Sequence, residues 1–145
     1  MERVVVSSLV PKDLRINEAL KTLRTNLMFS GPSVRVMGFT SFGPGEGKTT
    51  VAINLATALA MKGKRTLLVD CDIRNPSVAK ALGHANENGL VDFLKGRITA
   101  NDALFKPAQP DLYITFAGGP VDKAAEMLSS EGSKAFIEAA REAFD

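Results

Sequence analysis

Apolar and polar positions follow two different periods along the chain, and the changes of period mark the expected elements. Apolar residues recur at helical spacing over residues 16–27, which predicts a helix that begins at Asn17. The almost continuously apolar run over residues 34–40 predicts a buried strand. A glycine-rich turn and a helix over residues 48–62 follow.

The same alternation continues through the second half of the chain. Residues 65–70 and 112–117 read as strands, and short helices are expected after Asn75 and over residues 90–95. A last helix is expected from Ser133 onward. Strands that alternate with helices predict an α/β fold, with a mostly parallel sheet between two helical layers.

Composition narrows the class of protein further. The chain has 145 residues, 45% of them hydrophobic, and 18 Lys+Arg against 16 Asp+Glu give a net charge of +2. These values exclude a wholly disordered chain and argue against a bulk electrostatic nucleic-acid binder, so no nucleic-acid partner is expected. The single cysteine, Cys71, cannot form an internal disulfide, which favours the cytoplasm. No apolar run reaches the roughly 20 residues of a membrane span.

The clearest chemical signal is the segment SFGPGEGKTT at residues 41–50, between the predicted strand and the predicted helix. Its glycines let the backbone approach an anion closely, and the new helix N-terminus favours phosphate. Lys48 supplies a cation for the β- and γ-phosphates, the Thr49 hydroxyl is a ligand for Mg²⁺, and Thr50 can reach the α-phosphate. The residues expected to bind the nucleotide are Gly43, Pro44, Gly45, Glu46, Gly47, Lys48, Thr49 and Thr50.

The alternative for this segment is a glycine-rich turn that binds no ligand, followed by an ordinary surface lysine. The usual pattern, G-x-x-x-x-G-K-[ST], has glycine at the position where this chain has Phe42. The Gly-Lys-Thr ending and the flanking strand and helix nevertheless favour a phosphate-binding loop, or P-loop.

Two acids, Asp70 and Asp72, follow the second predicted strand. Because strand ends gather on the ligand side of a parallel sheet, both carboxylates are expected beside the P-loop. They would hold Mg²⁺ together with Thr49, and one could accept a proton from an incoming hydroxyl. The alternative is an acidic turn that caps the next segment. On this geometry Cys71 points away from the acids into the core, and His84 lies in an exposed loop.

Taken together, these segments resemble the bacterial tyrosine kinases, the P-loop autokinases that control capsule and exopolysaccharide export. The resemblance runs from about Pro11 to Asp145. The stretches that carry it are Glu18–Leu27, Thr40-Ser41 with Pro44–Thr49, Leu67–Pro76, Gly89–Gly96 and Glu126–Ser130.

The resemblance implies an ATP- and Mg²⁺-dependent protein-tyrosine autokinase. Residues 1–33 would form an N-terminal oligomerisation segment, and residues 34–145 the N-terminal part of the P-loop nucleotide-binding domain. Lys48, Asp70 and Asp72 would be the catalytic residues, the two acids organising the metal and activating a tyrosine hydroxyl.

The resemblance also implies partners. Glu18, Lys21 and Arg24 would make subunit contacts in a homo-oligomeric ring, with Lys21 standing where the family has arginine. A membrane-bound polysaccharide co-polymerase would act as activator, and would hold the protein at the inner face of the membrane.

Two departures from the family pattern lead to further expectations. In the family, a Phe-Asp pair is followed by an apolar strand that ends in a third acid, and later by a tyrosine-rich tail. Here Phe144-Asp145 is the last pair, so we expect C-terminal strands to be missing and this chain alone to be inactive. Tyr113, the single tyrosine, is expected to be packed rather than phosphorylated.

Two other functions stay open from the sequence. A ParA- or MinD-type partition or positioning ATPase would share the P-loop and the metal site, but such proteins carry a second lysine early in the loop, which is absent here. The helix over residues 18–27 also favours the kinase. The third possibility is a non-catalytic nucleotide-binding fragment.

Overall fold

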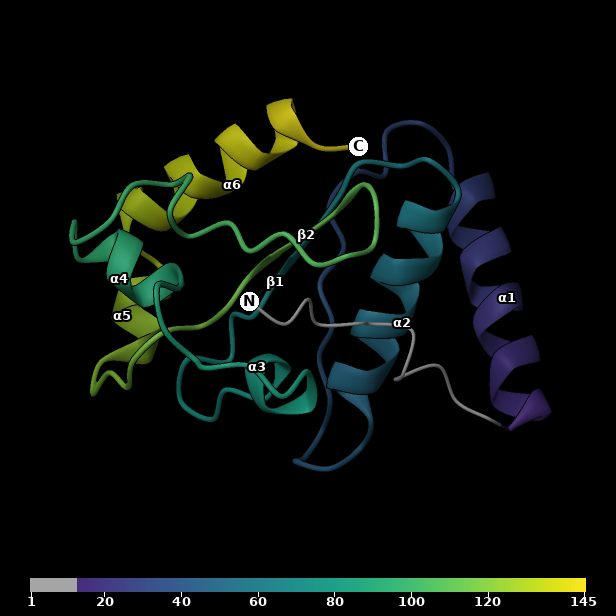
Figure 1. The fold of residues 1–145 in the computed structure, drawn as a ribbon, viewed down its shortest axis with the longest axis horizontal. Helices are drawn as coiled ribbons and strands as arrows, with labels where there is room; N and C mark the ends of the chain where they lie inside the picture. The colour runs from purple at the N-terminus through teal and green to yellow at the C-terminus, as the bar shows by residue number, and fades with distance from the viewer. Residues whose placement is uncertain (1–12) are drawn as a thin grey trace.

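A computed structural model of the chain describes residues 13–145 (Figure 1). Along this part of the chain, single strands separate pairs of helices. The elements are α1 (Leu14–Phe29), α2 (Lys48–Met61), β1 (Thr66–Val69), α3 (Val78–Ala81), α4 (Leu90–Leu94), β2 (Leu112–Thr115), α5 (Ala124–Leu128) and α6 (Glu131–Ala143).

The two strands pair in parallel and form the centre of the molecule. Their register runs from Thr66 opposite Leu112 to Val69 opposite Thr115. Helices α1 and α2 lie on one side of the strands and α4, α5 and α6 on the other, with α1 outside α2 (Figure 1). The predicted α/β architecture with a parallel sheet is therefore confirmed.

Helix α2 packs directly on the sheet. Its sequence is apolar nearly all round and rich in alanine, so it approaches the strands closely. Ile53 on α2 meets Leu68 on β1 and Ile114 on β2 in the main core cluster. Gly63 follows the helix with a φ of +78°, the left-handed conformation that commonly ends a helix. This rigid support fixes where the start of α2 lies relative to the end of β1.

The predicted strand over residues 34–40 is wrong. The segment is extended but joins no ladder within the described residues, and Val34, Val36 and Phe39 are 41%, 47% and 38% exposed. A strand needs a neighbour that offers its backbone groups, and among the described residues β1 pairs only with β2, which in turn forms a bridge from Ile114 to Phe105. The segment is held at its start, where the Arg35 guanidinium donates to the Phe144 carbonyl at 2.6 Å.

Helix boundaries differ from the predictions where another polar residue makes the cap. Helix α1 begins earlier than Asn17, because the Asp13 side chain accepts from the Arg15 N–H at 2.8 Å. Helix α6 begins at Glu131 rather than Ser133, because Ser130 is its N-cap. No helix starts at Asn75, and α3 begins at Val78.

Two ring side chains test the predicted packing. His84 is more buried than predicted, and Tyr113 is packed as predicted. His84, expected in an exposed loop, is half-buried between the rings of Phe105 and Phe116, at centroid distances of 4.4 and 4.8 Å. Tyr113 is packed as expected, with the Lys106 ammonium 4.0 Å from its ring centroid and the Phe144 ring at 5.2 Å.

Candidate functional site

The P-loop joins the extended segment to α2 and presents its backbone to solvent. Gly45 and Gly47 have φ values of +77° and +86°, which side-chain-bearing residues rarely adopt. Gly43 is not among the positive-φ glycines of the described residues. Gly47 is the N-cap of α2 and, within the described chain, no side chain caps this end. The first N–H groups of the helix therefore remain available to an anion.

Glu46, an exposed residue, braces the loop with its side chain. Its Oε2 accepts from the Phe42 N–H at 2.9 Å, and the Ser41 hydroxyl donates to the Gly43 carbonyl at 3.0 Å. The Phe42 side chain is fully exposed. At Phe42, where the usual motif has a glycine, the hydrogen bond to Glu46 thus helps to hold the curvature of the loop.

Asp72 reaches the P-loop from the end of β1. Its Oδ2 lies 3.4 Å from the Lys48 Nζ, and both side chains are about one-third exposed, at 35% and 32%. Its Oδ1 accepts from the Asn75 N–H at 3.2 Å. The sheet edge therefore brings one acid to the lysine of the P-loop.

Asp70 is turned toward its own loop instead. Its side chain is 5% exposed, Oδ1 accepts from the Asp72 N–H at 3.0 Å, and Oδ2 accepts from the Ser77 and Val78 N–H groups at 3.2 and 3.1 Å. Asp70 thus does for α3 what a capping residue does, in keeping with the alternative of an acidic turn. Three hydrogen bonds from backbone N–H groups hold this carboxylate in place, and through them it fixes the shape of the loop over residues 70–78.

Sequence reasoning missed Ser77. Its hydroxyl oxygen lies 2.5 Å from the hydroxyl oxygen of Thr49, the proposed metal ligand at the start of α2. The signal was present, because a serine directly follows Asn75-Pro76 and precedes a short helix. The predicted N-cap was Asn75, whereas the structure has Ser77 at this position.

The prediction that Cys71 points into the core is wrong. Cys71 is an exposed residue, because β1 ends at Val69 and the alternation of faces is not continued beyond it. The pKa of the Cys71 thiol is raised, first by desolvation and then by the negative charge of Asp70. The raised pKa leaves the thiol protonated and argues against a nucleophilic role.

The loops around β1 and α2 border a cleft of about 1260 Å³. Lys48, Thr49 and Asp72 line it near the carboxyl end of β1, and Arg65 and Phe144 line it near the other end of the strand. Within residues 13–145, no three acid, histidine or cysteine side chains lie so that they could hold a metal ion together. The donor set of one hydroxyl and one carboxylate fits Mg²⁺, an ion that takes oxygen ligands and keeps most of its shell as phosphate and water.

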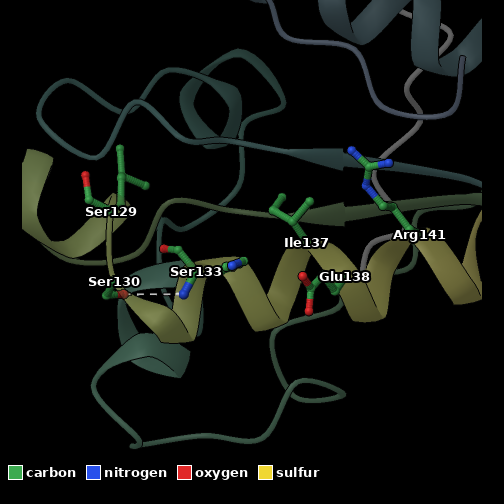
Figure 2. Close-up of a pocket in the computed structure, with 8 residues that line it drawn as sticks. Ser129, Ser130, Ser133, Ile137, Glu138 and Arg141 are labelled. Carbon is green, nitrogen blue, oxygen red and sulfur yellow. Dashed lines mark hydrogen bonds between the residues drawn. The ribbon is translucent and has the colours of Figure 1, made fainter.

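A smaller hollow of about 500 Å³ lies along α6 and contains none of the predicted site residues (Figure 2). Its serine hydroxyls are engaged in local structure, since Ser129 donates to the Ala125 carbonyl at 2.8 Å and Ser133 to the Met127 carbonyl at 3.0 Å. Ser130 accepts from the Ser133 N–H at 3.3 Å (Figure 2). These contacts explain the three serines as helix-end structure.

The residues expected at a subunit interface lie on α1. Glu18 and Lys21 form an ion pair of 3.1 Å on an exposed surface, and Arg24 is half-buried. No residue of α1 is fully buried. None of the helices in the described range combines the length and the apolarity needed to cross a bilayer.

Residues 37–141 match the CobQ/CobB/MinD/ParA nucleotide binding domain family, and the chain belongs to that family. The chain is 35% identical over 147 residues to the tyrosine-protein kinase YwqD of Bacillus subtilis, a match that covers all of this chain and 62% of YwqD. It is 37% identical over 126 residues to the succinoglycan biosynthesis transport protein ExoP of Rhizobium meliloti, covering 85% of this chain and 16% of ExoP. The resemblance to bacterial tyrosine kinases is therefore confirmed.

Solved structures agree with this assignment. The tyrosine kinase domain of BceF superposes with a TM-score of 0.83 at 31% identity, covering 97% of this chain and 56% of that domain. The septum site-determining protein MinD of Pyrococcus horikoshii, solved with Mg-ADP, gives a TM-score of 0.60 at 28% identity, over 73% of this chain and 44% of that one. The relation to MinD is thus the more distant one. The chain spans about three-fifths of the length of the kinases it matches.

Proposed function

We propose that this chain is the nucleotide-binding part of an ATP-dependent protein-tyrosine kinase that acts in capsule or exopolysaccharide synthesis and export. The observation that carries the proposal is the meeting of Lys48 and Asp72 at the end of β1, with their nitrogen and oxygen 3.4 Å apart. Lys48 and Asp72 line the same cleft, in a chain similar along its whole length to a tyrosine-protein kinase.

In this proposal the P-loop binds the phosphates. The backbone over residues 43–47 and the open end of α2 surround them, Lys48 contacts the β- and γ-phosphates, and Thr50 contacts the α-phosphate. Bound ATP supplies the phosphoryl group, and Mg²⁺ neutralises charge on its oxygens. Thr49 and Asp72 would hold the Mg²⁺ that accompanies the nucleotide.

Asp72 is also the residue best placed to accept a proton from the incoming tyrosine hydroxyl. Its Oδ2 faces the cleft beside Lys48, and its side chain is accessible. Asp70 contributes by position, because its three backbone contacts hold the loop that carries Asp72. We therefore assign proton acceptance to Asp72 and a positioning role to Asp70.

The acceptor is a tyrosine other than Tyr113. That residue, the single tyrosine of the chain, lies in β2 with its ring packed between charged and aromatic neighbours. A kinase acting in a ring would receive the acceptor from a neighbouring subunit, and the exposed surface of α1 with Glu18, Lys21 and Arg24 is the proposed contact. A membrane-bound co-polymerase, of the kind suggested by the transport protein ExoP, would be the partner at the inner face of the membrane.

The test uses the full gene product with ATP, Mg²⁺ and a glutamate–tyrosine copolymer as added acceptor. We expect phosphotyrosine on the protein or on the copolymer, and a loss of about a hundredfold in Asp72→Asn. ATP hydrolysis without any phosphotyrosine would overturn the kinase proposal and favour a positioning ATPase.

A further inference from the structure

The Ser77 side chain lies in the usual place for a helix cap but makes a different contact. Ser77 is the N-cap residue of α3, yet its side chain makes no capping hydrogen bond. A serine at this position normally accepts from an N–H group of the first turn. Here the Asp70 Oδ2 accepts from the Ser77 and Val78 N–H groups in its place. The Ser77 hydroxyl is thereby left to face Thr49, at 2.5 Å.

The pairing of these two hydroxyls is not local. Thr49 belongs to the start of α2 and Ser77 to the loop after β1, 28 positions further along the chain. Both side chains are part-buried, and both line the cleft that also holds Lys48 and Asp72. Asp70, itself 5% exposed, fixes the backbone of Ser77, so the position of the hydroxyl is set by a buried anchor.

A hydroxyl has one proton and two lone pairs. If Thr49 is to offer a lone pair to a divalent cation, its proton must point to another acceptor. The Ser77 oxygen is at hydrogen-bond distance for that proton. An outer partner of this kind orients a ligand and strengthens its bond to the metal.

We infer that Ser77 is a positioning residue of the magnesium–nucleotide site. Its hydroxyl oxygen accepts a hydrogen bond from the Thr49 hydroxyl and so turns a Thr49 lone pair toward the cation. The inference rests on the proposed function, which assigns Thr49 to Mg²⁺. It adds the Ser77 hydroxyl, from the loop over residues 70–77, to the Thr49 and Asp72 groups that the proposed function already assigns to this site. Ser77 itself touches neither the nucleotide nor the metal.

The experiment measures ADP affinity of the 145-residue chain by calorimetry, once in Mg²⁺ and once in EDTA. Wild type should bind ADP more tightly in Mg²⁺ than in EDTA. In Ser77→Ala we expect this Mg²⁺-dependent gain to fall by about tenfold, with the affinity in EDTA unchanged. Ser77→Thr keeps the hydroxyl and should restore the gain. Asn75→Ala, an exposed change in the same loop, is the matched control and should behave as wild type.

Ser77→Cys is the second variant, because a thiol of similar size is a weak acceptor and should lose part of the gain even if the alanine variant folds poorly. An unchanged or enlarged Mg²⁺-dependent gain in Ser77→Ala and Ser77→Cys would overturn the inference. So would an equal loss in Mg²⁺ and in EDTA, which would indicate a purely structural role. If wild type binds no ADP in either condition, the proposed function fails and the inference fails with it.

Discussion

The Lys48 ammonium and the Asp72 carboxylate face each other across the cleft, with Nζ and Oδ2 3.4 Å apart. The contact joins the first residue of α2 to the loop that follows β1. A phosphate bound by the P-loop would need the same ammonium. Asp72 and the nucleotide therefore compete for Lys48 unless a cation compensates the carboxylate charge.

Asp72→Asn should separate binding from transfer. Without the carboxylate charge, Lys48 is released and repulsion of the phosphates falls, so we expect ADP affinity in EDTA to rise by about two- to fivefold, the range expected for a partly exposed ion pair. Phosphotyrosine formation should fall in the same variant. Calorimetry in EDTA checks the first effect. Glu18→Gln, which breaks an exposed ion pair on α1, is the control and should leave ADP affinity unchanged. A weaker affinity in Asp72→Asn would contradict the competition.

Asp70→Asn should act mainly on folding. An amide cannot accept from all three backbone N–H groups that now bind the carboxylate, and a buried donor left unpaired is costly. We expect a loss of about 2–3 kcal/mol in the free energy of unfolding, measured by urea denaturation. Asp102→Asn removes an exposed carboxylate that also accepts from a backbone N–H, and serves as control with a much smaller loss. Equal stability of Asp70→Asn and wild type would mean that the loop does not depend on this anchor.

Gly89→Ala should be strongly destabilising. A Cβ at this position would lie 2.4 Å from both the Gly118 nitrogen and the Phe116 oxygen, which are backbone atoms that cannot turn away. The Leu90 N–H also donates to the Phe116 carbonyl at 2.8 Å, so a shift would break the link between α4 and the residue that follows β2. We expect a loss of about 3 kcal/mol or more. Gly119→Ala, where a Cβ meets open space, should change the melting temperature little. Similar melting of the two variants would contradict the packing described.

The turn that begins at Thr99 should respond to acid. Hydrogen bonds from the Thr99 hydroxyl first, and its N–H second, lower the pKa of Asp102. A lowered folded-state pKa means that this turn stabilises the protein fully above the carboxyl pKa of the unfolded chain, and that the contribution is lost as pH falls through the folded pKa. NMR titration of the carboxyl carbon should show Asp102 titrating below an unfolded-chain aspartate. Thr99→Val should raise the pKa part of the way back, and an unchanged midpoint in that variant would refute the assignment.

Local sequence patterns predicted an element correctly where the residue types alone decide the backbone conformation. The Gly-Lys-Thr sequence at residues 47–49 and the apolar runs of β1 and β2 predicted their elements closely. The strand over residues 34–40 was not correctly predicted, because apolar character indicates a possible strand but only a paired neighbour makes one. No feature of those residues alone reports whether a partner is present.

The site was predicted in part for a similar reason. Alternation along a strand placed Asp70 and Asp72 on one face, but β1 ends at Val69, so the two acids diverge. Which acid meets Lys48 depends on the course of the loop after β1, where backbone donors capture Asp70. The same loop brings Ser77 to Thr49, a contact between positions that no local motif relates.

The most direct measurement of the account is calorimetric titration of the 145-residue chain with ATP and Mg²⁺, compared with Lys48→Met. The methionine keeps the length of the side chain and removes the charge aimed at the phosphates. We predict that wild type binds and that Lys48→Met loses about tenfold or more in affinity, since a charge-assisted contact contributes roughly 1.5–3 kcal/mol. Equal affinity of the two proteins would show that the P-loop is not the phosphate site and would contradict the account.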